Sequence, residues 1–331
     1  MNKTLMGFSP YNFCMKKREQ IDYIYKIKKL KKEKNAIILA HYYQTGDIQD
    51  IADFVGDSLA LSQKAASNNA DVIVFAGVKF MAETAKILSP EKKVLLPDMN
   101  AGCSLADSCR AEDFKRFIDK NSGRTVVTYV NTNIDVKVLS DIICTSSNAV
   151  QIIESLPADE KIIFGPDRNL GNYIINKTGR DIIVWNGACH VHEEFSLEAI
   201  LKLKEENPGA KIIVHPECEL PVRMVADFIG STSALLQFTK IDDAKIYIVG
   251  TEPGIIHQMK KANSSKFYIP ASPKDSTCGC SECNFMKLVT IEKIYKCLRN
   301  EKPEIRIDPE ILRKARKPII RMMEISEKLG L

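Results

Sequence analysis

A twelve-residue segment occurs three times along this chain, and this repetition constrains the fold more than any other feature. The copies read ADFVGDSLALSQ at 52–63, SDIICTSSNAVQ at 140–151 and ADFIGSTSALLQ at 226–237. They begin 88 and 86 residues apart, and the first and third copies share seven of their twelve residues. A repeat of nearly constant spacing indicates a duplicated supersecondary unit. The 331-residue chain is therefore expected to contain three equivalent domains.

Each unit also contains three short apolar runs, of the kind that form strands buried in a parallel sheet. The runs lie at 36–40, 71–76 and 93–97, at 125–129, 161–164 and 181–185, and at 211–215, 245–249 and 266–270. Helix-forming stretches separate them, beginning with the repeated segment itself. This alternation predicts an α/β fold of three homologous three-layer αβα domains, with parallel sheets arranged in pseudo-threefold symmetry around a central site.

The same pattern predicts where the domains begin and end. We expect an N-terminal extension and helix at 1–35, α/β domains at 36–124, 125–210 and 211–290, and a C-terminal helical segment at 291–331. The active loops of open parallel sheets lie at the carboxyl ends of the strands. If the three sheets turn these ends toward one another, they will line one shared site.

A hydroxyl-bearing residue precedes the helical run in each repeated segment, namely Ser58, Ser146 and Thr232. The N-cap of a helix is expected at this point, and capping alone would explain each of these residues. Helix N-termini also bind carboxylates and phosphates, because their unpaired backbone N–H groups carry a partial positive charge. Three hydroxyls at matched positions therefore predict that they surround one anionic ligand.

The repeat also aligns polar residues just past the first strand of each unit. One position holds His41, Tyr129 and His215, and the position two residues later holds Tyr43, Asn131 and Glu217. Residues two apart along a strand point to the same side of the sheet. Any one of them, taken alone, is explained by packing as a satisfied polar group. Six at equivalent positions instead form a set suited to acid–base chemistry and to polarising a carbonyl.

Cysteines form a third matched set, in the loops that follow the third strand of each unit. Cys103 and Cys189 are 86 residues apart, and the equivalent loop of the third unit contains Cys278, Cys280 and Cys283. One thiolate from each unit would suit a [4Fe–4S] cluster whose fourth iron stays open to a ligand. Tetrahedral zinc is the competing interpretation, and the three cysteines of the third unit would alternatively bind zinc locally or form a redox pair.

Composition and charge exclude several classes of function. The net charge of +5, with 45% hydrophobic and 27% charged residues, is ordinary for a soluble globular protein. No basic run is interleaved with aromatic residues, so nucleic-acid binding is not expected. No apolar run approaches the roughly 20 residues of a membrane span, and no signal-peptide core is present at the N-terminus. A cytoplasmic location is expected, where ten cysteines are unlikely to be structural disulfides.

Taken together, these residues resemble the quinolinate synthase family, the iron–sulfur enzymes of de novo NAD biosynthesis. The resemblance extends from about residue 21 to 326 and rests on AHYYQTGDIQDIADFVGDSLALSQ, GVKFMAETAKIL, YVNTN, CTSSNA, WNGACHVHEEF, VHPEC, GSTSALL and ECNFMK. It implies that iminoaspartate and dihydroxyacetone phosphate condense to quinolinate, phosphate and water, with the open iron of a [4Fe–4S] cluster as Lewis acid. An L-aspartate oxidase or dehydrogenase would supply the iminoaspartate.

The resemblance also implies roles for individual residues. The cluster ligands would be Cys103, Cys189 and Cys283, the last because it directly precedes the segment Asn284-Phe-Met-Lys287, where Asn284 replaces a familiar proline. Cys280 would pair reversibly with Cys278 or Cys283 as a redox switch. The catalytic residues would be Tyr43, Tyr129, His215 and Glu217. Substrate would be bound by His41, Ser58, Asn131, Ser146, His192 and Thr232.

Two other functions compete with this interpretation. A non-catalytic iron–sulfur redox sensor would use a solvent-reachable cluster as its switch. It predicts a surface for DNA or a partner, such as a basic helix-turn-helix, which we do not find in the sequence, and it leaves the polar strand ends unexplained. A zinc hydrolase would need histidine and carboxylate ligands close to an open metal position.

Overall fold

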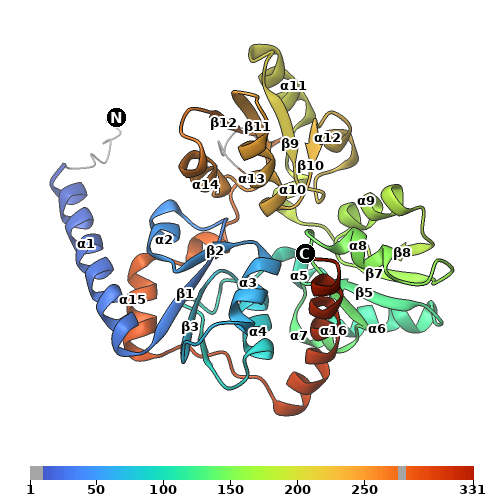
Figure 1. The fold of residues 1–331 in the computed structure, drawn as a ribbon, viewed down its shortest axis with the longest axis horizontal. Helices are drawn as coiled ribbons and strands as arrows, with labels where there is room; N and C mark the ends of the chain where they lie inside the picture. The colour runs from blue at the N-terminus through green and yellow to red at the C-terminus, as the bar shows by residue number, and fades with distance from the viewer. Residues whose placement is uncertain (1–9, 275–280) are drawn as a thin grey trace, which may run out of the picture.

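Three four-stranded sheets, each with all of its strands parallel, form the framework of the protein (Figure 1). The computed structural model describes residues 10–274 and 281–331. The first sheet has the order β2-β1-β3-β4, the second β6-β5-β7-β8 and the third β10-β9-β11-β12. The strands are β1 (Ala36–His41), β2 (Phe54–Gly56), β3 (Val72–Ala76), β4 (Lys93–Leu95), β5 (Thr125–Tyr129), β6 (Ile142–Cys144), β7 (Ile162–Gly165), β8 (Ile182–Val184), β9 (Lys211–Val214), β10 (Phe228–Ile229), β11 (Ile246–Gly250) and β12 (Phe267–Pro270).

Helices connect the strands and cover the sheets, which confirms the predicted α/β fold class. They are α1 (Pro10–Glu33), α2 (Gly46–Ile51), α3 (Ser58–Ala66), α4 (Lys79–Leu88), α5 (Ser104–Asp107), α6 (Ala111–Lys120), α7 (Ile134–Val138), α8 (Ala149–Glu154), α9 (Arg168–Thr178), α10 (His190–Glu193), α11 (Leu197–Glu206), α12 (Leu220–Met224), α13 (Thr232–Ile241), α14 (Ile255–Ala262), the 3₁₀ turn η1 (Met286–Leu288), α15 (Ile291–Asn300) and α16 (Pro309–Lys328). Across the described residues, every helix falls short of the length and apolar character needed to cross a bilayer.

The repeated segment contains a strand as well as a helix, which the sequence pattern did not predict. Its apolar pair forms β2, β6 or β10, each of which pairs with the first strand of its own unit. Strands of two or three residues are too short to show a periodic pattern. The structure explains why an acid recurs at the same position of each copy. The carboxylates of Asp53, Asp141 and Asp227 each accept a hydrogen bond from a backbone N–H of the first strand of their own unit, at 2.7, 2.8 and 2.7 Å.

The helix caps lie at different residues from those predicted. Asp57 caps α3 by accepting from the N–H of Ala60, and Ser231 caps α13 by accepting from the N–H of Ala234. In the second unit, α8 begins only after Asn148. Ser58 and Thr232 are therefore the first residues of their helices and Ser146 precedes its helix. Because Asp57 and Ser231 do the capping, the hydroxyls of Ser58 and Thr232 are not needed for it.

The hydrophobic cores distinguish the third unit from the other two. One continuous cluster includes Ile38 of the first sheet, Ile143 of the second and Met322 of α16. The third sheet has two separate clusters, one containing Ile213 and the other Ile212, because neighbouring residues of β9 face opposite sides. Figure 1 accordingly shows α15 and α16 beside the first and second units, with the third unit above them.

The units are also linked by the helices that precede their first strands. Helix α6 packs Phe114 against Val126 of β5 and Ile163 of β7, although the predicted boundary at 124/125 assigns it to the first domain. In the same way, Ile200 of α11 packs against Ile212 of the third sheet. The predicted domain boundaries themselves stay predictions.

Candidate functional site

One cavity is lined by all thirteen residues to which the sequence analysis assigns catalysis, substrate binding or cluster ligation. It lies where the carboxyl ends of the three sheets meet, so residues up to about 240 positions apart in sequence share it. The lining includes His41, Tyr43, Ser58, Cys103, Tyr129, Asn131, Ser146, Cys189, His192, His215, Glu217, Thr232 and Cys283. The pseudo-threefold register therefore does bring the three strand ends, the three hydroxyls and the three cysteines into one space.

Each of the three cysteines reaches the cavity from the loop predicted for it. Cys103 directly precedes α5, Cys189 directly precedes α10, and Cys283 lies just before η1. The first two loops are joined, because the hydroxyl of Ser104 lies 2.6 Å from Nδ1 of His190. Cys278 and Cys280, the residues of the predicted redox pair, lie outside the described residues.

Buried carboxylates hold the backbone of two of these cysteines. The N–H of Cys189 donates to Asp167 at 2.9 Å, and the N–H of Cys283 donates to Glu252 at 3.4 Å. Burial raises the pKa of the Cys103 thiol to about 12 and also raises that of Cys189. A thiol in these surroundings ionises only when a cation is bound to it, as in a metal site.

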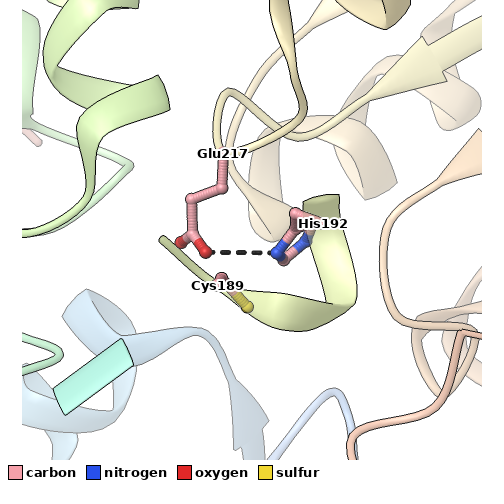
Figure 2. Close-up of side chains that lie close together, drawn as sticks. All are labelled: Cys189, His192 and Glu217. Carbon is pink, nitrogen blue, oxygen red and sulfur yellow. Dashed lines mark ion pairs between the residues drawn. The ribbon is translucent and has the colours of Figure 1, made fainter. Parts of the chain in front are cut away.

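The spacing of the donor atoms distinguishes a single ion from a larger group. Among the described residues, only Cys189, His192 and Glu217 place three ligand atoms within 4.8 Å of one another (Figure 2). The three cysteine sulfurs do not form such a group. A tetrahedral zinc ion would hold its sulfur ligands only about 3.8 Å apart, given Zn–S bonds of about 2.3 Å. Three converging thiols with wider spacing fit a polynuclear iron–sulfur cluster better than a single zinc ion bound by the same thiols.

Glu217 is the centre of a buried acid–base network. Its carboxylate accepts a hydrogen bond from the hydroxyl of Tyr129 at 2.6 Å and lies 3.1 Å from Nδ1 of His192. Figure 2 shows this contact between Glu217 and His192, with Cys189 next to the pair. Burial opposes ionisation of Glu217, but His192 and the hydrogen bond from Tyr129 outweigh it and lower the pKa of the carboxyl below its ordinary value. Glu217 is therefore ionised although its side chain is buried.

The network continues to the first unit through a residue that the sequence analysis missed. The hydroxyl of Thr251 lies 3.0 Å from Nε2 of His192 and 2.8 Å from the hydroxyl of Tyr43. Tyr43 is also 3.0 Å from the hydroxyl of Thr232. Burial and then the charge of Glu217 raise the pKa of Tyr43, so its phenol stays protonated. A series of close polar contacts thus runs from Tyr43 through Thr251 and His192 to Glu217.

Hydroxyl and amide groups line the remaining part of the cavity. The hydroxyl of Ser146 lies 3.1 Å from Nε2 of His215, and burial lowers the pKa of this histidine to about 3. The imidazole is therefore neutral and can either donate or accept one proton. The amide oxygen of Asn131 is buried and has no hydrogen-bond partner among the described residues. An unpaired polar atom in a cavity wall indicates a place where a ligand binds.

Two acidic residues that line the cavity, Asp57 and Glu252, and the neighbouring Thr251 escaped the sequence analysis. Asp57 accepts from Ser147 of the second unit at 2.7 Å, and Glu252 pairs with Lys287 at 2.7 Å. Lys287 also donates to the backbone carbonyl of Tyr43 at 2.7 Å. Thr251 and Glu252 directly follow β11, and the carboxyl end of this central strand was the signal available for finding them.

The buried histidine of the first unit predicts how stability depends on pH. Burial lowers the pKa of His41 from 6.5 to about 4. Between pH 6.5 and 4 this histidine is therefore protonated in the unfolded chain but neutral in the folded chain. The contribution of His41 to the free energy of unfolding is complete above pH 6.5 and is lost as the pH falls toward 4. We expect His41→Gln to reduce the slope of unfolding free energy against pH by up to about 1.4 kcal/mol per pH unit in this range. Urea titrations of both proteins would measure it, and equal slopes would contradict the prediction.

Comparison with known proteins identifies the family. The profile of the quinolinate synthetase A protein family matches residues 25–324. The chain is 56% identical over 306 residues to the quinolinate synthase of Thermosynechococcus vestitus, covering 92% of this chain and 96% of that protein. It is 58% identical over 300 residues to that of Microcystis aeruginosa (91% and 94% covered) and 52% identical over 327 residues to that of Chloroherpeton thalassium (99% and 100%). A profile match over most of the chain and relatives that are more than half identical show that this chain belongs to the quinolinate synthetase A family of enzymes.

Proposed function

We propose that this chain condenses iminoaspartate with dihydroxyacetone phosphate to form quinolinate, releasing phosphate and water. Its relatives are named quinolinate synthases, which supports the product. The observation that carries the proposal is the meeting of three cysteine thiols and a buried Glu217 network in one cavity. The reaction joins carbon to carbon, moves protons, forms an imine and expels water. Such steps require positioned acids and bases and a group that stabilises developing negative charge.

A [4Fe–4S] cluster fits the residues present. Cys103, Cys189 and Cys283 would hold three of its irons, since all three thiols line the cavity and are spaced too widely for one zinc ion. When bound, the cluster would supply a Lewis-acidic iron with a free position for a carboxylate, a ring nitrogen or a departing hydroxyl. Asp167 and Glu252 would keep two of the cysteine loops in place through the backbone N–H bonds that they accept.

Anchoring of the anionic substrates would fall to the neutral hydrogen-bonding groups. Ser58 and Thr232 begin helices of 9 and 10 residues, whose first backbone N–H groups favour carboxylate or phosphate. Asn131, Ser146 and His41 would orient the substrates from the other sides. Because water is largely excluded from a buried site, each of these hydrogen bonds would be stronger than at the surface.

Proton transfer would be carried by the network around Glu217. As an ionised carboxylate, Glu217 would accept a proton from the substrate directly or through the hydroxyl of Tyr129. His215 is neutral, so it would accept a proton as one bond forms and return it to a leaving hydroxyl. Tyr43, whose phenol stays protonated, would donate to a developing oxyanion, and His192 would connect it with Glu217 through Thr251.

The proposal places the chain in NAD biosynthesis in the cytoplasm. Iminoaspartate hydrolyses readily because it is an imine, so an enzyme that oxidises L-aspartate, an oxidase or a dehydrogenase, would have to supply it.

The proposal is tested by supplying both substrates to the protein after anaerobic reconstitution with iron and sulfide. We expect a brown protein with about four iron and four sulfide per chain, and formation of quinolinate and phosphate in equal amounts. A brown protein that forms no quinolinate would favour the redox sensor. A colourless protein that binds one zinc ion and no sulfide would overturn the proposal, and Cys189, His192 and Glu217 would then be the candidate ligands of that ion.

A further inference from the structure

Two buried side chains that have no part in the proposed chemistry lie at equivalent positions of the internal repeat. Gln49 lies on α2 of the first unit and Lys137 on α7 of the second, 88 residues further along. Gln49 is 2% exposed and Lys137 is fully buried. Long polar side chains are rarely buried to this extent unless their polar ends are bound. Neither residue lines the cavity, so the reason for burying them has to be sought in what they contact.

Both side chains donate to backbone carbonyls on either side of a cavity residue. Nε2 of Gln49 donates to the carbonyls of Tyr42 and Gln44 at 2.9 and 2.8 Å, which enclose Tyr43. Nζ of Lys137 donates to the carbonyl of Val130 at 2.9 Å and to that of Thr132, which enclose Asn131. The acceptors are themselves equivalent in the repeat. The amide of Gln49 in the first unit and the ammonium of Lys137 in the second unit thus make the same pair of contacts, although the residues differ.

Each side chain also reaches the neighbouring unit. Nε2 of Gln49 also lies 2.9 Å from the carbonyl oxygen of Gly254 in the third unit, so its two hydrogens are shared among three acceptors. The ammonium of Lys137 lies 5.5 Å from the ring centre of Phe80, a residue of the first unit that lines the cavity. Both donors therefore orient a loop and also set its position relative to the next wall of the cavity.

We propose that Gln49 and Lys137 are positioning residues, which hold the loops carrying Tyr43 and Asn131 in the geometry needed for the reaction. The inference rests on the proposed function, because it assumes that these two side chains meet the substrate. The two loops end strands of different sheets, and no regular secondary structure fixes them. The two loops are held instead by the hydrogen bonds that Gln49 and Lys137 donate to their backbone carbonyls. Their position matters because a displacement of about 1 Å at a reacting group is enough to slow catalysis about 100-fold.

Four variants test the proposal. Lys137→Met and Gln49→Leu keep the side-chain size but remove the donors, whereas Lys137→Gln installs the neutral donor that the first unit uses. Lys266→Met is the matched control: Lys266 is buried, donates to the carbonyls of Thr239 and Asp242, and lies 5.4 Å from the ring centre of Tyr247, outside the cavity. The readouts are hydrogen–deuterium exchange of the segment 129–132 without ligand, iron content, and kcat and KM for both substrates.

We expect Lys137→Met to raise exchange at the amides of Val130 and Thr132 about tenfold and to lower kcat/KM by about 10- to 100-fold at unchanged iron content. Lys137→Gln should recover most of this loss, and Gln49→Leu should lower kcat/KM in the same range. Lys266→Met should leave both exchange at 129–132 and kcat/KM unchanged. Wild-type kinetics in Lys137→Met and Gln49→Leu would overturn the inference while leaving the proposed function intact. Wild-type protein that makes no quinolinate would overturn the proposed function, whereas unchanged exchange in Lys137→Met would overturn the inference without reference to activity.

Discussion

Cys189→Ser is expected to lose both the iron–sulfur cluster and quinolinate formation. A serine hydroxyl does not ionise in a buried site and is a hard oxygen ligand, whereas iron–sulfur clusters are held by thiolates. Two cysteines would remain, too few to hold the cluster. A Lewis acid contributes several kcal/mol to stabilising a transition state, so turnover should fall by at least about 1,000-fold.

The measurements for this variant are iron and acid-labile sulfide per chain, visible absorbance, and quinolinate formed under anaerobic conditions. Cys297→Ala is the matched control, because Cys297 is buried on α15 and is not among the residues lining the cavity. It should retain wild-type iron, colour and turnover. If Cys189→Ser kept a full complement of iron and sulfide, the assignment of the three ligands would be wrong.

Glu217→Gln is expected to lower kcat by about 100- to 10,000-fold while leaving the cluster in place. The amide keeps the size of the side chain and an oxygen to accept from Tyr129. It removes the negative charge that faces His192 and the site that would accept a proton. KM should change much less than kcat, because in our proposal Glu217 moves protons and other residues hold the substrates.

Asp242→Asn provides the comparison for this variant. Its carboxylate also accepts from a tyrosine hydroxyl, that of Tyr247 at 2.8 Å, and pairs with Lys211, but it lies outside the cavity. Its kcat should match that of the wild type. Near wild-type turnover by Glu217→Gln, measured at equal iron content, would remove Glu217 from the proton-transfer role.

The fold class and the composition of the cavity wall were both accessible from the repeat. Equal spacing predicts equal units, and parallel sheets collect their functional residues at one end of the strands. This is why His41, Tyr129 and His215 could be grouped although 88 and 86 residues separate them. Cys103 and Cys189 followed by the same reasoning, since each lies in the loop after a third strand, whereas Cys283 was selected among three cysteines by the family resemblance.

The features that the sequence did not reveal depend on very short elements or on contacts between units. The strands β2, β6 and β10 have three, three and two residues, and only their pairing partners define them. The caps of α3 and α13 lie one residue before the predicted hydroxyls because Asp57 and Ser231 accept the hydrogen bond instead. The strand registers place Gly77 and Pro166 at the positions equivalent to Thr251, so the repeat gave no reason to select it.

The different residues at equivalent positions of the three units determine how a ligand can be oriented. A symmetric enclosure with identical walls would accept a ligand in three rotations of equal energy. Here, a ligand rotated from the third unit toward the second would meet Tyr129 in place of His215 and an amide in place of the Glu217 carboxylate. The three rotations are therefore unequal in free energy, and a molecule with two carboxylates would enter in one sense only. Under the proposed function, divergence of the three copies would select a single regiochemical outcome from a scaffold that by itself has no preferred direction.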